Sequence, residues 1–482
     1  MDAMRPSRFP AVARLFMVAF ACCAAVPCAQ LAAAGPGPAG EPPSAKQEQV
    51  IQWIGSHALP LKSVNAGAGF EDLQPLESLL KDVQVVGLGE ATHGTREIFQ
   101  MKHRMLEFLV KRMGFTVFAI EASTQACWAI NDYVLHGKGD KADALAGQGF
   151  WTWDTEEVLG MITWMREYNA TVPEEKKVKF LGFDCQDTDQ TLKVVPDYLR
   201  KIAPEFAPRA QALVRIQDIH RRQLEQQRRE ATGAVKDQYL DRRKAAKAVA
   251  PVMELLDLFA LNRERFIASS SEAEFNKVFL HVRLMKQWYD VMNFMNAFSN
   301  TRDRYMAENI RTILGWGPPG TRMVVWAHNA HVGAFNWKGK PTSMGTHLKD
   351  AFGPAYYAFG FCLNRGRFQA RDGGGDRSLS EFEFGPAEGE CIEWFFARAG
   401  LSVALLDLRQ TAGEPGIRSW FSTERTLREQ GALAYRKRPL SRDRMVLSSS
   451  FDGLIFIENT TRARPNPTGL RPPAEKPWWK LW

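Results

Sequence analysis

A carboxylate and an imidazole lie three residues apart in the stretch GLGEATHG, as Glu90 and His93. The stretch joins an apolar run to a charged segment with a helical pattern. A carboxylate beside an imidazole orients the ring and makes it more basic, so that the ring can take a proton from water. The same two side-chain types also bind divalent metals. The stretch therefore points to proton transfer or to metal binding.

The glycines of this stretch do not predict a nucleotide site. Gly87, Gly89 and Gly94 miss the spacing of the dinucleotide-binding motif, and Glu90 would stand where a pyrophosphate needs backbone donors. The Lys-Ser/Thr pair of a P-loop is also missing. We therefore expect the chemistry of this stretch to use no nucleotide cofactor.

Three further stretches place acidic or imidazole side chains after apolar runs. Glu121 follows the run TVFAI, Asp184 ends the run FLGFD, and the stretch WAHNAHV carries His328 and His331. A buried carboxylate is costly unless it is paired or hydrogen-bonded. Residues three apart in a straight strand face opposite sides of a sheet, so both histidines reach one cleft only if the chain turns at Asn329. We expect that turn, and a cleft that all four side chains share.

The residue types favour attack by water over attack by a serine. The motif GxSxG is absent, since Ser343 has Pro341 where the first glycine should stand, and nothing local marks Ser123 as a strained nucleophile. One histidine would take the proton of water, and a second histidine or an arginine would stabilise the oxyanion. The expected reaction is hydrolysis of an ester or a lactone.

Two alternatives to this reaction remain open. Three histidines and a carboxylate would also ligate zinc or manganese, which would make the protein a metal-dependent hydrolase. The histidines would equally hold a ligand such as haem in a protein without catalytic activity.

The elements that must position these residues alternate between strand and helix. Apolar runs at 83–89 and 115–122 predict strands, and 97–112 predicts a helix that Gly114 ends. Four further strands are predicted by the stretches KVKFLGFDCQ, TRMVVWAHNAHV, LSVALLDLR and FDGLIFIEN. The alternation predicts an α/β fold with a central, mostly parallel sheet and helices on both faces. In such sheets ligands bind at the carboxyl ends of the strands, where the candidate residues stand.

The chain divides into a leader, a linker, one large domain and a tail. Residues 1–34 show the basic, apolar and small-residue order of a cleaved secretory signal, which predicts an exported, periplasmic or secreted protein without a stable membrane span after processing. We expect a flexible linker at 35–45, an α/β domain at 46–462 and a Pro-rich tail without regular structure at 463–482. Residues 197–315 carry long helical patterns and almost no strand signal, which predicts a helical insertion that packs against the sheet.

The charge distribution argues against a nucleic-acid-binding function, and the cysteine content leaves the redox state open. The 482 residues carry a formal net charge of +8, and residues 212–251 hold ten Lys or Arg against five Asp or Glu, a net of +5. Charges of both signs alternate there and aromatic residues are nearly absent, so the stretch predicts a solvated helix rather than a nucleic-acid surface. Buried thiols and disulfides both remain open for the four cysteines beyond the leader, Cys127, Cys185, Cys362 and Cys391.

Five stretches together resemble the erythromycin esterase family, over about residues 45–460. They are GLGEATHGTREIFQMKHRMLEFLVKRMGFTVFAIEA, FLGFDCQ, RDRYMAENI, WAHNAHV and SMGTHLKDAFGPAYYAFGF. The resemblance implies an α/β fold with a helical elaboration beside a deep cleft. It also implies a metal-independent hydrolase without a cofactor, which opens the macrolactone ring of erythromycin-like antibiotics and so confers antibiotic resistance. The implied partner is a small-molecule ester or lactone.

The resemblance implies a role for each candidate residue. His93 resembles the general base of the family, and Glu90 stands in the same Glu-x-x-His element. Glu121 matches the second acidic position, and His328 and His331 match the paired histidines of the family.

The family also has an essential arginine in the helix after the base. Arg96 and Arg104 both fit that description, and Asp184 is expected with them as a group that binds the substrate or the transition state. The cleft wall is expected to be aromatic, from Trp128, Phe150, Trp151 and Trp153. The leader is a departure, because the resistance enzymes of this family are typically cytoplasmic.

Overall fold

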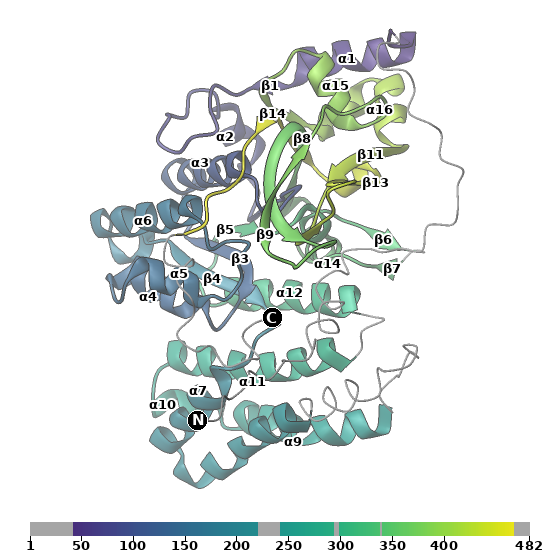
Figure 1. Ribbon diagram of the computed structural model, residues 1–482. Coiled ribbons are helices and arrows are strands. Elements are labelled where there is room, and N and C mark those ends of the chain that lie inside the picture. Colours follow the sequence, from purple (N-terminus) through teal and green to yellow (C-terminus); the bar gives the residue numbers. More distant parts are fainter. Residues whose placement is uncertain (1–41, 220–241, 294–297, 338–339, 467–482) are drawn as a thin grey trace, which may run out of the picture.

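The computed structural model describes residues 42–466, except 220–241, 294–297 and 338–339 (Figure 1). The predicted leader at 1–34, residues 35–41 of the predicted linker and residues 467–482 of the predicted tail lie outside the described residues. Most of the basic stretch at 212–251 lies outside them as well.

The described part of the chain forms one ten-stranded sheet with a parallel centre. Its main path runs in the order β1 (Leu59–Pro60), β10 (Val403–Asp407), β14 (Gly453–Thr460), β8 (Tyr356–Asp372), β2 (Val85–Leu88), β5 (Met323–Trp326), β3 (Val117–Ser123) and β4 (Lys179–Asp184). All neighbours from β14 to β4 are parallel, whereas β10 pairs with β14 and β1 with β10 in antiparallel fashion. The predicted α/β class is confirmed.

The strand β8 was missing from the sequence-based prediction. It lies between β14 and β2, and it runs on beyond the sheet centre to pair with β9 (Leu379–Phe384) and β12 (Leu433–Ala434). Its first half is apolar and buried, but its second half reads NRGRFQARD and mixes charged with apolar residues. The charged residues of the second half do not indicate a strand. The place of β8 at the centre of the sheet is set by its pairing with β14 and β2.

Successive residues of the central strands pack on opposite faces of the sheet, as the two-residue period of a strand requires. Val86, Leu88 and Phe118 belong to one apolar core, and Val85 and Val117 belong to the other. The first core is covered by α3 (Arg96–Met113), α4 (Cys127–His136) and α6 (Glu156–Thr171). The second is covered by α1 (Ala45–His57), α12 (Phe298–Leu314), α14 (Met344–Phe352), α15 (Ile392–Arg398) and α16 (Pro415–Phe421).

A helical layer lies below α12 in Figure 1. It contains α7 (Thr191–Ile202), α9 (Arg242–Leu261), α10 (Arg263–Ala268) and α11 (Glu272–Asn293). These helices share an apolar core of their own, which includes Leu199, Phe259 and Phe275. No strand occurs among the described residues of the predicted insertion at 197–315.

Besides short 3-10 helices, the described chain has several smaller helices and strands. They are α2 (Pro75–Leu79), α5 (Lys141–Gly147), α13 (Asn329–Val332), α17 (Leu447–Ser450), and the two-stranded pairs β6 (Asn336–Trp337) with β7 (Lys340–Pro341) and β11 (Glu424–Glu429) with β13 (Ser441–Val446). The chain stays packed against the domain beyond the predicted domain end at 462, since Ala463 and Asn466 are fully buried.

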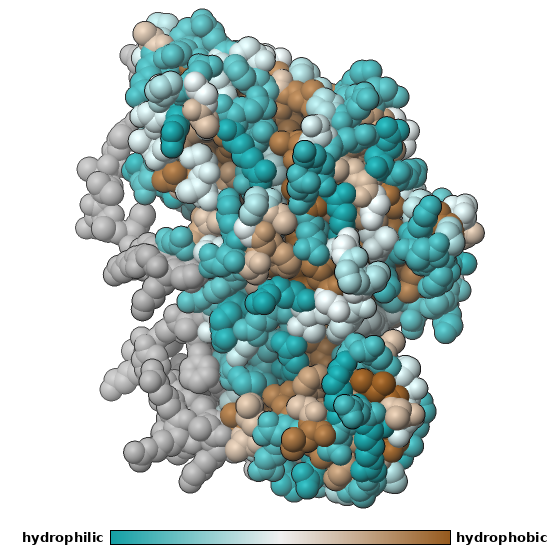
Figure 2. Space-filling view, turned by 180° about the vertical axis from the view of Figure 1, so that it is seen from behind, coloured by the Kyte–Doolittle hydropathy of each residue, from teal (hydrophilic) through white to brown (hydrophobic). Residues whose placement is uncertain are grey.

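The described surface is mainly hydrophilic on the side that Figure 2 shows, with hydrophobic patches between the hydrophilic residues. Three of the four exposed large hydrophobic residues among those described, Val214, Met253 and Leu261, lie between α7 and α10 in the chain. Within the described residues, no helix is both long and apolar enough to cross a bilayer. Buried free thiols, rather than disulfides, are found at Cys127, Cys185, Cys362 and Cys391.

Candidate active site

Glu90 and His93 lie in the loop between β2 and α3, at the carboxyl edge of the sheet. Gly89 starts this loop where no side chain fits, because a Cβ atom there would lie 2.3 Å from Asn329 Oδ1 and 2.8 Å from the Phe359 carbonyl oxygen. Asn329 in turn donates its backbone N–H to the Glu90 carbonyl oxygen at 2.9 Å. The close approach brings the loops after β2 and β5 together.

The predicted turn at Asn329 is confirmed. The strand β5 ends at Trp326, and α13 starts at Asn329 with His328 as its N-cap, whose Nδ1 accepts the Ala330 N–H at 3.2 Å. The short helix puts His331 back toward the carboxyl edge. Both histidines therefore reach the same site.

The carboxylate of Glu90 is fully buried and accepts three hydrogen bonds. Its Oε1 lies 2.5 Å from His93 Nδ1, and its Oε2 accepts from Lys102 Nζ at 2.8 Å and from Trp326 Nε1 at 2.7 Å. The ammonium of Lys102 also lies 4.2 Å from the centre of the Trp326 ring. Each nitrogen donor has a fixed place around this carboxylate.

These contacts set the charges of the group. Burial opposes the ionisation of Glu90, but Lys102 and His93 outweigh it and hold the pKa of Glu90 at about 2. Burial lowers the pKa of Lys102 to about 8, against the pull of Glu90. An ionised carboxylate only accepts hydrogen bonds, so His93 Nδ1 must donate, and in the neutral imidazole the lone pair is then on Nε2. His93 is thereby oriented as a base.

A second cluster is built around Arg302, which comes from α12. Its Nε and one terminal nitrogen donate to Asp184 at 3.1 and 2.9 Å, and the same terminal nitrogen donates to Glu121 Oε1 at 2.7 Å. Burial opposes the positive charge of Arg302, but the carboxylates of Asp184 and Glu121 raise its pKa well above the usual value. The pKa of Glu121 is held below its usual range by His331 and Arg302, despite its burial.

His331 joins this cluster to α12 and α14. Its Nδ1 lies 2.7 Å from Asp303 Oδ1, and its Nε2 lies 3.1 Å from Arg302 and 3.3 Å from Glu121 Oε1. Asp303 is itself held by the Met344 N–H, which donates to it at 2.8 Å.

His328 stands between the two clusters. Its ring centre lies 4.9 Å from that of His93, and its backbone N–H donates to Glu121 Oε2 at 3.0 Å. Burial and the neighbouring His93 lower the pKa of His328 to about 3, so the ring is neutral at neutral pH. Its Nδ1 accepts from Ala330, and the proton on Nε2 points to the Gln430 carbonyl oxygen at 3.3 Å.

Six of the eight residues predicted from the sequence meet at this edge of the sheet, namely Glu90, His93, Glu121, Asp184, His328 and His331. The two predicted arginines do not. Arg104 is fully buried in an ion pair with Asp72 and donates to the Ser63 and Gly69 carbonyl oxygens at 2.6 and 2.7 Å. Arg96 pairs with Glu157 at 3.4 Å. Arg104 thus anchors the loop that precedes α2, and Arg96 links α3 to α6.

Four residues of the site were missed, namely Lys102, Trp326, Arg302 and Asp303. A signal for Lys102 exists, because it interrupts the apolar face that Ile98, Met101 and Met105 form at helical spacing. Arg302 and Asp303 open the stretch RDRYMAENI, which contributed to the family resemblance, but this stretch is polar, helical and far from any strand, and the two residues were not assigned to the site. Of the predicted aromatic wall, Trp153 contacts His93 edge to face with ring centres 5.9 Å apart.

The metal alternative requires at least three ligands that face one point. In the parts of the chain that the structure describes, no three His, Cys, Asp or Glu side chains converge in that way. Both oxygens of Glu90 already accept from nitrogen donors, and so does each oxygen of Asp184. The donor set is arranged for ion pairs and proton transfer.

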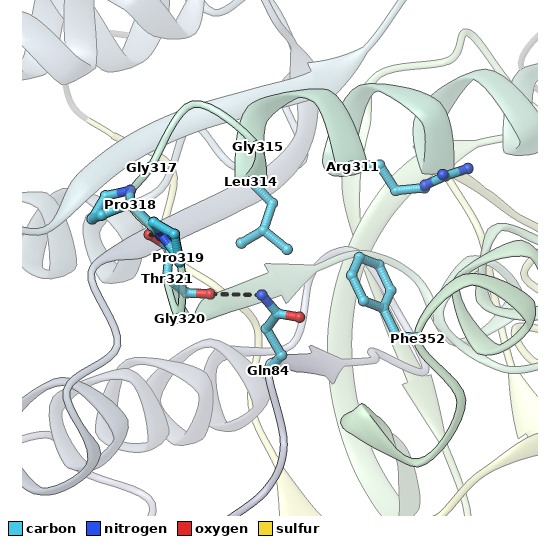
Figure 3. Close-up of a pocket in the computed structure, with 10 residues that line it drawn as sticks. All are labelled: Gln84, Arg311, Leu314, Gly315, Gly317, Pro318, Pro319, Gly320, Thr321 and Phe352. Atoms are coloured by element: carbon cyan, nitrogen blue, oxygen red, sulfur yellow. Dashed lines mark hydrogen bonds between the residues drawn. The ribbon is translucent and has the colours of Figure 1, made fainter.

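A hollow of about 340 Å³ lies elsewhere, at the amino ends of β2 and β5 (Figure 3). Gln84, Arg311, Phe352 and Thr321 contribute to its lining, and Gln84 Nε2 donates to the Thr321 carbonyl oxygen at 3.1 Å. Its lining holds no carboxylate or imidazole side chain, so it offers no acid–base chemistry.

Comparisons with known proteins match most of the chain. The family model described as Erythromycin esterase matches residues 110–460, a range that starts after Glu90 and His93. The protein named Putative hydrolase YbfO, from Bacillus subtilis (strain 168), is 24% identical over 441 residues, which cover 85% of this chain and 90% of that protein. Erythromycin esterase type II from Escherichia coli is 24% identical over 338 residues, or 66% of this chain and 78% of that enzyme. A crystal structure of a Bacillus cereus protein matches with a TM-score of 0.74 at 23% identity, and covers 88% of this chain and all of that one.

Proposed function

Because this chain belongs to the erythromycin esterase family of hydrolases, we propose that it cleaves a carboxylic ester or a lactone with water activated by His93. The observation that carries this proposal is the hydrogen bond between His93 Nδ1 and the ionised Glu90, which leaves Nε2 as the proton acceptor. The activated water would attack the carbonyl carbon directly, without a covalent enzyme intermediate.

In the proposed first step, His93 Nε2 takes a proton from water while the water oxygen bonds to the carbonyl carbon. Glu90 stabilises the imidazolium that forms, and Lys102 keeps Glu90 ionised so that the carboxylate goes on accepting the Nδ1 proton. The tetrahedral intermediate then loses its alkoxy oxygen. His93 returns the proton to that oxygen, which gives a carboxylic acid and an alcohol.

The negative charge of the intermediate needs a cation or hydrogen-bond donors. A guanidinium has five N–H bonds, and the contacts of Arg302 with Asp184, Glu121 and His331 use four of them. We assign the remaining N–H of Arg302 to the developing oxyanion. Such donors contribute most when they are fixed in advance, as the three side chains around this guanidinium ensure.

A macrolide lactone is the first substrate to test, because a relative is named erythromycin esterase. Purified protein would be incubated with erythromycin and with a panel of simple esters, with and without a chelator, and the products weighed by mass spectrometry. A gain of one water on the macrolide, unaffected by the chelator, is the expected result. Hydrolysis of simple esters alone would retain the reaction and discard the macrolide.

The two alternatives make different predictions in the same experiment. Loss of activity with the chelator, together with bound metal in the purified protein, would favour the metal-dependent hydrolase. A coloured, ligand-loaded preparation without any turnover would favour the binding protein. His93→Ala would then lower the ligand content, because the histidines hold the ligand in this alternative.

We also propose that the chain is exported and loses residues 1–34. Expression in a bacterial host followed by fractionation and N-terminal sequencing tests this directly. An intact Met1 on protein from the cytoplasm would overturn it.

A further inference from the structure

The chain that follows β14 crosses the loops beside His93. We call residues 461–466 the C-terminal strap. In Figure 1 it continues from β14 past α3 toward α6. Every third residue of the strap points inward, since Ala463 and Asn466 are fully buried while Thr461 and Arg464 are exposed. The pattern is that of a segment with a fixed place on the fold.

The first half of the strap is hydrogen-bonded to the residues that follow His93. The Ala463 N–H donates to the Gly94 carbonyl oxygen at 2.9 Å, and the Arg96 N–H donates to the Thr461 carbonyl oxygen at 3.0 Å. Thr461 also donates from its backbone and its hydroxyl to the Glu97 carboxylate, at 2.7 and 2.6 Å. The peptide next to His93 is therefore held by the strap.

The start of α3 depends on these contacts. A helix leaves its first N–H groups without internal partners, and a side chain at the N-cap usually accepts one of them. Thr95 is the N-cap of α3 and makes no such bond with its side chain. The Thr461 carbonyl oxygen accepts from Arg96 in its place. The helix that carries Lys102 thus begins on the strap.

The second half of the strap holds the segment that carries Trp153. The Glu156 N–H donates to the Arg464 carbonyl oxygen at 2.8 Å, and the Asn466 N–H donates to the Asp154 carbonyl oxygen at 2.9 Å. Asn466 Nδ2 donates to Asp154 Oδ1 at 2.8 Å. The Thr155 N–H in turn donates to the Trp153 carbonyl oxygen at 2.9 Å.

One short segment therefore holds both sides of the contact between His93 and Trp153, whose ring centres lie 5.9 Å apart. We propose that the C-terminal strap is a positioning element, which fixes the imidazole of His93 against the indole of Trp153 and so aims its Nε2 at the reacting water. This role rests on the proposed function of His93. Displacement of a catalytic group by about 1 Å is enough to cost about 100-fold in rate.

Two truncations of the full chain test the role of the strap. One ends at Asn466 and keeps the strap, and the other ends at Thr460 and removes it. Relative to the first, the second should lose about 10- to 100-fold in kcat with a smaller change in KM. The variant Asn466→Leu removes only the side-chain hydrogen bonds of Asn466 to Asp154 and Ala142, and it replaces the truncation at Thr460 if that chain does not fold.

A second readout needs no substrate. With ¹³C-labelled histidine, the nuclear magnetic resonance signal of His93 is identified by its absence in His93→Gln, and its pH titration is followed in both truncations. Loss of the strap should move the His93 signal and its titration midpoint, while the signals of distant histidines stay in place.

The outcomes separate the strap from the proposed function. An unmoved His93 signal, or equal kcat with and without the strap, overturns the positioning role. If the intact chain hydrolyses nothing, the proposed function fails, and the His93 signal still decides the role of the strap.

Discussion

The ion pair of Lys102 and Glu90 gives the sharpest test of the proposed base. The pKa of Glu90 falls from 4.5 to about 2, which corresponds to about 3 kcal/mol in favour of the folded state. That contribution is present above about pH 4.5 and is lost as the pH falls toward 2. The pKa of Lys102 falls from 10.5 to about 8, a cost of similar size at neutral pH. Burial of both charges thus offsets much of what their attraction contributes to stability.

Replacement of one partner is not neutral. Lys102→Met leaves Glu90 buried without its cation, and breaking a buried pair in this way costs about 3–5 kcal/mol. Burial then raises the pKa of Glu90, because the largest opposing charge is gone. A protonated Glu90 no longer accepts the Nδ1 proton of His93. We expect kcat/KM to fall at pH 7 and its acid limb to move to higher pH.

The assay is the pH profile of kcat/KM together with urea unfolding at pH 7. Lys102→Arg keeps the charge and should retain the position of the acid limb better than Lys102→Met. Lys111→Met is the matched control, because Lys111 is exposed on the same helix and makes no contact with Glu90. A wild-type pH profile in Lys102→Met would refute the role of Lys102 in keeping Glu90 ionised.

Four other outcomes are expected. His93→Ala should lower kcat by about 100- to 10,000-fold in steady-state assays while the circular dichroism spectrum is retained, and unchanged turnover would remove His93 from the mechanism. The activity of the wild-type protein should decline above about pH 8, as Lys102 loses its proton, and a flat profile to pH 10 would contradict the pKa of that lysine. Arg302→Lys should lower kcat more than it raises KM, since a lysine cannot make the forked contacts, and equal effects on both constants would speak against the oxyanion role. Glu121→Gln should lower kcat and also the thermal midpoint, because it removes a partner of Arg302, and normal kinetics would reduce Glu121 to a structural role.

Much of the site was accessible from the sequence because strand ends carry a local signal. Glu90, Glu121 and Asp184 each follow a short apolar run, and parallel strands bring their carboxyl ends to one edge. The turn at Asn329 followed from the period of a strand, since His328 and His331 would otherwise face opposite sides.

The parts that were missed depend on contacts between distant segments. Arg302 reaches Glu121 across 181 positions of sequence and Asp184 across 118, so no window of residues contains the pairing. Arg104 was predicted at the site but lies outside it. Its residue type and its place on α3 suited the site, but its side chain pairs with Asp72 in a preceding loop. Which basic residue meets a buried carboxylate is settled by packing rather than by spacing.

The helical layer of α7, α9, α10 and α11 has an apolar core of its own, and this affects which substitutions the fold tolerates. Leu199, Phe259 and Phe275 pack among helices and not against the sheet. Lys102, Glu90 and His93 lie on the other side of α12, from which Arg302 reaches the site. Substitutions at the three apolar positions of the layer therefore act first on the core of the layer, whereas Leu280 and Leu284 of α11 belong to the core that covers the sheet. Changes confined to this separate core leave untouched the side chains that hold Glu90 and His93 in place.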